Sequence, residues 1–142
     1  MDYEYAALSA LTFGIWKRPW EEGTEAPGLR GIGRYDAEHY DPSHYRPSRP
    51  YAPFFYTDRF DAYWASKILI RLTPAHIEAA VSQGMFSDPR SGAYLQRTIV
   101  ARQRETARHW FSEVNPVDSF ELASDADGFR LCATDLLLRH GL

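Results

Sequence analysis

Side chains of the kinds that bind divalent metals are crowded into one short segment of the chain. Three carboxylates and two imidazoles occur within nine residues, contributed by Asp36, Glu38, His39, Asp41 and His44. Oxygen and nitrogen donors of these types are ligands of zinc and similar ions. Their spacing, however, matches no established metal site, and the surrounding sequence has no periodic pattern. We therefore assign no metal ligand here and expect solvent exposure or local hydrogen bonding.

Four arginines form a second pattern, spaced by seven, seven and four residues: Arg90, Arg97, Arg104 and Arg108. On an α-helix they would fall within about 40° of one another, as one stripe along the helix. The stripe is a candidate surface for an anion or an acidic partner. Alternatively, the guanidinium groups pair with carboxylates of the same chain, such as Asp118, Asp125 and Asp127. We expect internal pairing, with carboxylates of the C-terminal hairpin or the N-terminal strap, because the planar guanidinium suits fixed carboxylate contacts.

No other pattern indicates catalysis or a cofactor. Gly28, Gly31 and Gly33 are spaced like a phosphate-binding loop, but no strand signal precedes them and no helix with a lysine follows. The sequence has neither a serine nucleophile elbow nor the paired histidines of a zinc protease. We therefore assign no catalytic residue and no cofactor-binding residue, and we expect the chain alone not to be an active enzyme.

Three helices are predicted between residues 57 and 114. The first covers 57–72 and repeats a large apolar residue every fourth position, at Phe60, Trp64, Ile68 and Leu72. This spacing produces an apolar stripe wide enough to pack on a core. Thr57 or Asp58 is suited to cap the first turn.

The second helix begins at the Thr73-Pro74 cap and is predicted to end at Gly84 in a left-handed conformation. Ser87-Asp88-Pro89 repeats the cap-then-proline signal and opens the third and longest helix, from Pro89 to about Val114. Its inward residues are predicted to be Leu95, Ile99, Thr106, Trp110 and Val114. Trp64 and Trp110 are predicted to pack between the first and third helices.

Beyond residue 115 the apolar residues alternate. Phe120 and Leu122, and then Phe129 and Leu131, flank Asp127-Gly128, which predicts a small β-hairpin. Cys132 is expected to be a small buried hydrophobe. A last helical turn or two is predicted to start at the Thr134-Asp135 cap and to end at Gly141.

Residues 1–56 fit neither helical nor strand periodicity. Prolines and glycines interrupt the segment 21–56, yet tyrosines and phenylalanines recur through it. Large aromatics in an irregular segment indicate burial, so this strap is predicted to lie over the helices or on a partner. The predicted fold is mainly α: one domain, 1–142, with the strap in 1–56, a helical core in 57–114, and the hairpin and terminal helix in 115–142.

Composition excludes several classes of protein. The 142 residues carry a formal net charge of −3, with a pI near 5.9 and no known nucleic-acid reader motif, so we expect no nucleic-acid partner. A single cysteine cannot form an internal disulfide, and Asp2 and Glu4 stand where a signal peptide would be basic. No stretch is apolar enough to span a membrane. These features favour a cytoplasmic location.

From about Asp2 to its end, the chain resembles the C-terminal region of an uncharacterised family of bacterial hypothetical proteins. The matching landmarks are Thr12-Phe13-Gly14, Arg18-Pro19-Trp20-Glu21, Gly31-Ile32-Gly33-Arg34-Tyr35-Asp36, Tyr40-Asp41-Pro42, Asp61-Ala62-Tyr63-Trp64-Ala65-Ser66-Lys67-Ile68, Phe86-Ser87-Asp88-Pro89, Tyr94-Leu95, Asn115-Pro116-Val117-Asp118 and Arg139-His140-Gly141-Leu142. In longer relatives this region follows an N-terminal part that is remotely similar to protein-kinase-type phosphotransferases. The present chain has no counterpart of the nucleotide-binding lysine or the metal-binding aspartate of such enzymes.

Two functions are therefore expected as alternatives. The first is a non-catalytic helical interaction or accessory module that contacts an acidic protein surface or an upstream domain of a longer relative. The second, which the resemblance implies, is the C-terminal helical portion of a phosphotransferase-like enzyme whose catalytic part is absent from this chain. Because the activity of the family is unknown, the resemblance supplies no functional residue.

Overall fold

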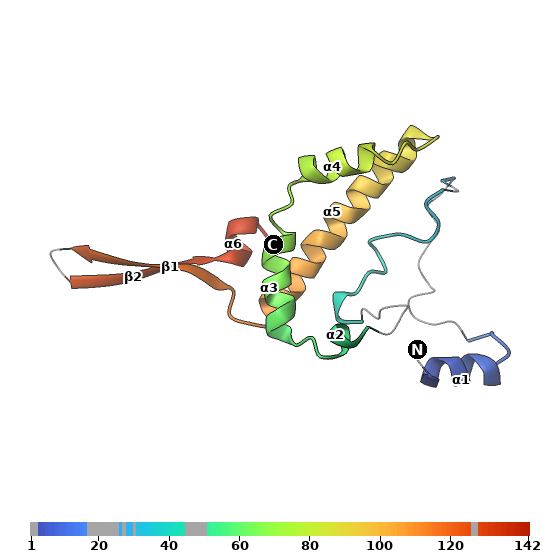
Figure 1. Ribbon diagram of the computed structural model, residues 1–142, viewed down its shortest axis with the longest axis horizontal. Coiled ribbons are helices and arrows are strands. Elements are labelled where there is room, and N and C mark those ends of the chain that lie inside the picture. Colours follow the sequence, from blue (N-terminus) through green and yellow to red (C-terminus); the bar gives the residue numbers. More distant parts are fainter. Residues whose placement is uncertain (1–2, 17–25, 27, 30, 45–50, 126–127) are drawn as a thin grey trace.

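The structure is a computed structural model, and it describes residues 3–16, 26, 28–29, 31–44, 51–125 and 128–142. In chain order the elements are α1 (Tyr3–Leu11), η2 (Pro42–His44), α2 (Ala52–Phe55), α3 (Arg59–Leu69), α4 (Pro74–Ser82), α5 (Pro89–Ser112), β1 (Val117–Asp125), β2 (Gly128–Asp135) and α6 (Leu136–His140). The predicted fold class is confirmed: the chain is mainly helical, with an irregular N-terminal stretch and a C-terminal antiparallel hairpin (Figure 1). The short helices α1 and α2 were not predicted. The landmark 18–21 and the turn residue Asp127 lie outside the described residues.

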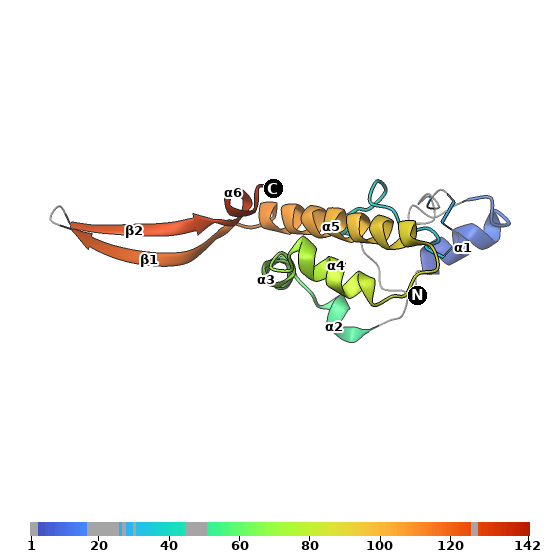
Figure 2. The ribbon, with the colours of Figure 1, turned by 90° about the horizontal axis from the view of Figure 1, so that it is seen from above.

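Helix α5 is the element on which helices α3, α4 and α6 pack. Helices α3 and α4 lie on the same side of it, and α6 lies at its C-terminal end (Figure 2). The apolar core is at that end, where Ala107 and Phe111 are fully buried beside Leu136. The Tyr63 ring from α3 meets the Phe111 ring edge-on, with 5.5 Å between the ring centroids. The core is therefore small and joins α3, α5 and α6.

Side-chain caps account for the start of each core helix, as predicted. Asp58 accepts hydrogen bonds from the amides of Phe60 and Asp61, and the Asp61 carboxylate accepts one from the Asp58 amide. Thr73 caps α4 in the same reciprocal way with His76, whereas Asp88 caps α5 by accepting from the Arg90 amide alone. These groups satisfy amides that the first turn of a helix leaves free.

The prediction that Gly84 ends α4 in a left-handed conformation is wrong. It is Met85, with φ of 45°, and not Gly84 that adopts a left-handed conformation. A Cβ atom at position 84 would lie 2.7 Å from the Phe86 ring, so a larger residue there would force that ring to shift. The predicted end of α6 is confirmed, since Gly141 has φ of 60°.

The predicted inward faces of α3 and α5 are also wrong. On α3 the buried residue is Ser66, which lies about 200° around the helix from Trp64. On α5 the buried residues are mostly small or polar: Ser91, Thr98, Gln103, Ala107 and Phe111. The predicted residues Leu95, Ile99, Thr106, Trp110 and Val114 are only partly buried. Small side chains at the contact between α3 and α5 allow the two helix backbones to approach closely. The largest apolar residues of α3 lie on the other side of that helix, outside the contact.

A buried amide joins α3 to α5. The Gln103 side chain is 5 % exposed, and its Nε2 donates to the carbonyl oxygens of Leu69 and Leu72, both at 2.7 Å. These carbonyls belong to the C-terminal end of α3, where helix geometry leaves acceptors free. Gln103 therefore caps one helix from the side of another.

The hairpin extends away from the helices as an arm (Figures 1 and 2). In its register Leu122 faces Leu131 and Ser124 faces Phe129, with an irregularity between Asp118 and Glu121. Phe120, Leu122, Phe129 and Leu131 are between 62 and 80 % exposed, so no other described part of the chain covers this apolar face. Cys132 is also exposed, contrary to the prediction that it would be buried.

Residues 35–40 of the strap lie on α5, which is one of the two predicted placements. Tyr51, Phe54, Phe55 and Tyr56 of the same strap are instead 54 to 83 % exposed, so no described part of the chain covers them. Arg102 is central to the contact of the strap with α5, because its Nε donates to the Asp36 carbonyl oxygen at 2.6 Å. Its guanidinium carbon also lies 4.0 Å from the Tyr35 ring centroid and 4.7 Å from that of Tyr40. The Tyr40 hydroxyl is 2.8 Å from the Thr106 hydroxyl. One arginine thus holds the strap by a charge-assisted hydrogen bond and two cation–π contacts.

Replacing Arg102 by Leu is expected to release the strap from α5. The charge-assisted hydrogen bond alone contributes about 1.5–3 kcal/mol, and both tyrosine rings lose their cation. Hydrogen–deuterium exchange should become faster in residues 31–44 while the exchange of α3 and α5 changes little. Arg108→Leu, at an exposed arginine of the same helix that pairs with Glu105, is the matched control. Unchanged exchange in 31–44 would show that other contacts hold the strap.

Candidate functional site

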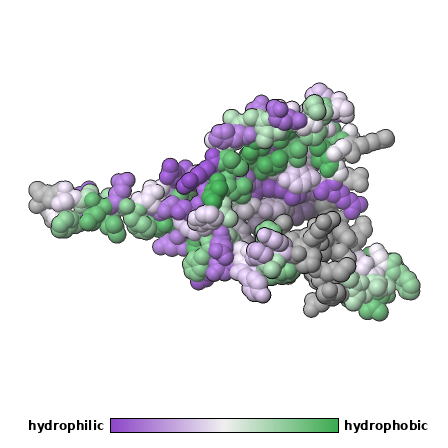
Figure 3. Space-filling model, in the orientation of Figure 1, coloured by the Kyte–Doolittle hydropathy of each residue, from purple (hydrophilic) through white to green (hydrophobic). Residues whose placement is uncertain are grey.

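A row of large apolar side chains on the helical body faces solvent. Phe60, Trp64, Ile68 and Leu72, here called the α3 stripe, are 58, 64, 48 and 48 % exposed, respectively. Their four-residue spacing places them in one row along α3 and the turn that follows it. In the space-filling view, hydrophobic residues gather over α3 and α4 and along the hairpin arm (Figure 3). The periodicity that predicted a core-facing stripe therefore identifies an exposed one.

Contiguous apolar patches on soluble monomers rarely exceed a few hundred Å² unless they mark a contact site. The α3 stripe and the arm are thus the parts of the described chain best suited to contact another surface.

A pocket of about 320 Å³ lies where α3, α5, the base of the arm and α6 meet. Its lining residues come from four separate segments of the sequence: Lys67, Ile70, Arg71, Phe111, Asp118, Ser119, Leu136, Arg139 and His140. No spacing in the sequence predicts this set, because only the packing of α6 and β1 beside α3 brings it together. We call this cavity the basic pocket.

One ion pair closes an edge of the basic pocket. Lys67 Nζ lies 2.7 Å from Asp118 Oδ2, and hydrogen bonding to Lys67 lowers the pKa of that carboxyl. Ser119 follows with φ of 54°, in the left-handed region where residues other than glycine are uncommon. This residue lies at the irregularity in the register of the arm, so the strand changes direction where it borders the pocket.

His140, at the opposite edge, has a lowered pKa. Burial is the main cause, and the positive charges of Arg139 and Arg104 add to it. Because the pKa in the folded chain is below the ordinary value of 6.5, the unfolded chain binds the proton more readily. The contribution of His140 to stability is therefore complete above pH 6.5, and it is lost as the pH falls from there through the lower pKa of the folded state.

We accordingly expect the free energy of unfolding to decline between pH 7.5 and pH 5, and His140→Gln to make this decline shallower. Urea denaturation followed by circular dichroism at several pH values tests the expectation. His76→Gln, in the exposed first turn of α4, is a control for the loss of an imidazole. An equal pH dependence in the wild type and His140→Gln would contradict the assignment.

The arginine stripe is only partly paired as predicted. Arg90 contacts Asp88 at 2.7 Å, and Arg108 pairs with Glu105 on the same helix. Arg104 binds main-chain oxygens instead, with Nη2 2.6 Å from the Gly141 carbonyl oxygen and Nη1 3.4 Å from that of His140.

No contact of the stripe thus reaches a carboxylate of the hairpin or strap among the described residues. Within that part of the chain, Arg97 is the member of the stripe whose guanidinium binds no other residue. It lines a second, shallower pocket with Leu29 and Tyr94. Three of the four arginines are therefore occupied within the chain, and docking of an acidic partner on the stripe stays a prediction.

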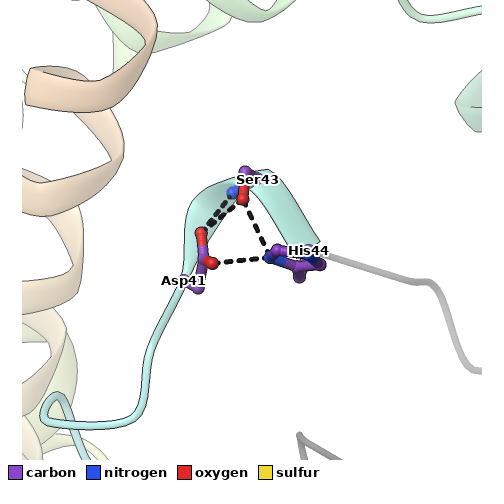
Figure 4. Close-up of polar contacts among 3 residues, drawn as sticks. All are labelled: Asp41, Ser43 and His44. Atoms are coloured by element: carbon purple, nitrogen blue, oxygen red, sulfur yellow. Dashed lines mark hydrogen bonds and ion pairs between the residues drawn. The ribbon is translucent and has the colours of Figure 1, made fainter.

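The cluster Asp41, Ser43 and His44 has the residue types of a catalytic triad but not its geometry (Figure 4). Asp41 Oδ2 and Ser43 Oγ lie 2.6 Å and 2.9 Å from the same ring nitrogen, Nδ1 of His44. In a working triad the serine and the acid contact opposite nitrogens of the histidine. Ser43 Oγ also donates to Asp41, at 2.6 Å, so the hydroxyl proton is directed away from any substrate.

Hydrogen bonds, first from the Ser43 hydroxyl and then from His44, lower the pKa of Asp41 to about 2. All three residues are exposed at the start of η2. This arrangement matches the expected local hydrogen bonding. In the same segment His39 Nδ1 is 3.4 Å from Asp36 Oδ1, and the described residues contain no group of three or more side chains arranged to hold a metal.

Comparisons with protein-family models, curated proteins and solved structures found no match to this chain. The resemblance described above and the phosphotransferase-related function that it implies are therefore untested and stay predictions. Among the described residues, no helix is both long enough and apolar enough to cross a bilayer.

Proposed function

We propose that this chain is a non-catalytic interaction module, and that the α3 stripe binds an amphipathic helix of a partner protein. The exposure of Phe60, Trp64, Ile68 and Leu72 is the observation that carries the proposal. Fully burying one large apolar side chain contributes about 1.5–3 kcal/mol. Because each of these four is still about half exposed or more, a partner can gain a substantial part of that energy at every position.

The shape of the stripe favours a helix as the bound element. A row of side chains at four-residue spacing meets the matching row of another helix over several turns, as in recognition of a helix by an apolar surface. Arg59 is exposed beside Phe60 at the start of the row. Its charge favours an acidic residue that flanks the apolar face of the partner helix, and this agrees with the acidic partner expected from the sequence.

Site-specific photo-cross-linking tests this proposal. A cross-linking amino acid is placed at position 64 in the stripe, and at position 78 on the exposed side of α4 as the matched control. In cells that produce the protein, we expect position 64 to capture a segment of another protein that is amphipathic and acidic at its flanks. A synthetic peptide of that segment should become helical on binding.

Binding of this peptide to purified variants completes the test. Trp64→Ser with Ile68→Ser should weaken binding at least tenfold, whereas Glu78→Ser should change it less than twofold. Circular dichroism checks that each variant keeps its fold. Equal capture from positions 64 and 78, capture of a second copy of this chain, or a peptide that the double variant binds normally would each overturn the proposal.

A further inference from the structure

We propose that the basic pocket binds the phosphate group of a small phosphate-bearing organic molecule. This site is separate from the α3 stripe and does not depend on its function. The pocket has a volume of about 320 Å³, which lies within the range of small-molecule sites in proteins. It is formed where four segments converge, so its side chains are positioned by packed secondary structure.

The charges of the basic pocket match a phosphate dianion. Lys67, Arg71 and Arg139 contribute three permanent positive charges, and Asp118 contributes one negative charge, which leaves a balance of +2. A phosphate monoester carries about −1.5 to −2 at pH 7. A single carboxylate would neutralise only half of this charge. The balance therefore favours phosphate over a simple carboxylic acid.

Two arginines are available to hold the ligand. Lys67 is occupied by Asp118, but no described residue accepts a hydrogen bond from the guanidinium of Arg71 or Arg139. Arg71 comes from the end of α3 and Arg139 from α6, so they approach the cavity from different elements. Guanidinium groups donate paired hydrogen bonds that fit phosphate oxygens. In contrast, three members of the arginine stripe already have partners.

The remaining lining residues indicate that the ligand has an apolar organic part in addition to its phosphate group. Ile70 supplies the accessible apolar part of the wall, and the buried side chains of Phe111 and Leu136 lie behind it. An apolar wall next to charged groups excludes water and makes their interaction with an anion stronger. Inorganic phosphate would leave Ile70 uncovered, whereas a phosphate ester with a ring or chain would cover it.

Binding is measured by NMR titration of the full chain with three probes. Phenyl phosphate has both a dianion and an apolar ring, inorganic phosphate has only the anion, and phenol has only the ring. We expect phenyl phosphate to bind at least fivefold more tightly than inorganic phosphate, and phenol not to bind. The shifted amide signals should come from Arg71, Ser119 and His140.

The His140 imidazole gives a second readout at the pocket. Positive groups surround it on several elements: Arg104 on α5, Arg139 beside it on α6, and Lys67 and Arg71 across the pocket on α3. Asp118 on β1 is the acid at the opposite edge. A bound dianion stabilises the imidazolium, so phenyl phosphate should raise the pKa of His140 measured by NMR.

Two double variants distinguish a specific binding site from a general attraction of the ligand to positive charge. Arg71→Gln with Arg139→Gln should weaken phenyl phosphate binding at least tenfold. Arg59→Gln with Arg97→Gln removes the same charge from exposed positions outside the pocket and should change binding less than twofold. Thermal unfolding verifies that both double variants stay folded. Three results would overturn the site: no binding by the folded wild type, equal weakening in both double variants, or signal shifts centred on Arg97.

Discussion

Replacing Phe111 by Ala is expected to lower the free energy of unfolding by about 3–5 kcal/mol. The Phe111 side chain is fully buried and contacts Tyr63 of α3, Ala107 of its own helix and Leu136 of α6. Truncation would remove this contact from three elements at once, and the backbone of α5 cannot move in to fill the cavity. Because small domains are stable by only about 5–15 kcal/mol, the loss is a large share of the total. Urea denaturation followed by circular dichroism measures it.

Trp64→Ala is the control for this prediction. It removes a larger aromatic side chain that is 64 % exposed, so we expect a change of no more than about 0.5 kcal/mol. The loss of stability in Trp110→Ala should lie between those of the other two variants, because the Trp110 ring is partly buried. This ring meets the His109 ring edge-on, with 4.6 Å between the ring centroids. A Trp64→Ala variant as unstable as Phe111→Ala would show that the stripe belongs to the core and would also contradict the proposed function.

Gln103→Leu is the second substitution with a large expected effect. Leucine keeps the size of the side chain but cannot donate to the carbonyl oxygens of Leu69 and Leu72, which are partly buried and then have fewer partners. An unsatisfied buried polar group costs about 1–3 kcal/mol, and the Leu69 oxygen keeps its bond from the Leu72 amide. We therefore expect a loss of about 2–3 kcal/mol.

Two further variants distinguish the loss of the donor from a change of shape. Gln103→Glu is nearly isosteric but replaces the donor with an acceptor, so it should destabilise the chain at least as much as Gln103→Leu. Gln96→Leu, at a partly buried position on the same helix, should change stability by less than about 0.5 kcal/mol. Normal stability of Gln103→Glu would show that the two hydrogen bonds contribute little.

Local chemistry made much of the fold predictable. The caps Asp58, Thr73 and Asp88 act within a few residues of the helix starts that they define, so reading the sequence locates those helices. The αL position of Gly141 and the alternation in the hairpin are equally local signals. The apolar residues of helix α1 follow no helical period, which explains why it was not predicted.

Which face of a helix is buried depends on the partner that packs against it. Periodicity finds the stripe through Phe60 and Trp64 correctly, but it cannot show that Ser66, on the opposite side, makes the close contact. The spacing in the sequence also identifies the stripe of arginines, but it does not single out Arg102. This residue lies off that stripe and makes the contacts that hold the strap. The basic pocket was beyond prediction, because its residues are spread from Lys67 to His140 and meet only after packing.

The arm formed by β1 and β2 has a consequence for hydrogen exchange. Isolated two-stranded hairpins are only marginally stable in water, and the apolar face of this one is uncovered by any described residue. Its amides beyond Glu121 should therefore exchange through local opening of small free energy, while those around Phe111 exchange only when the helical body unfolds. Protection measured in the arm reports what the arm itself binds, and protection in α5 reports the stability of the fold.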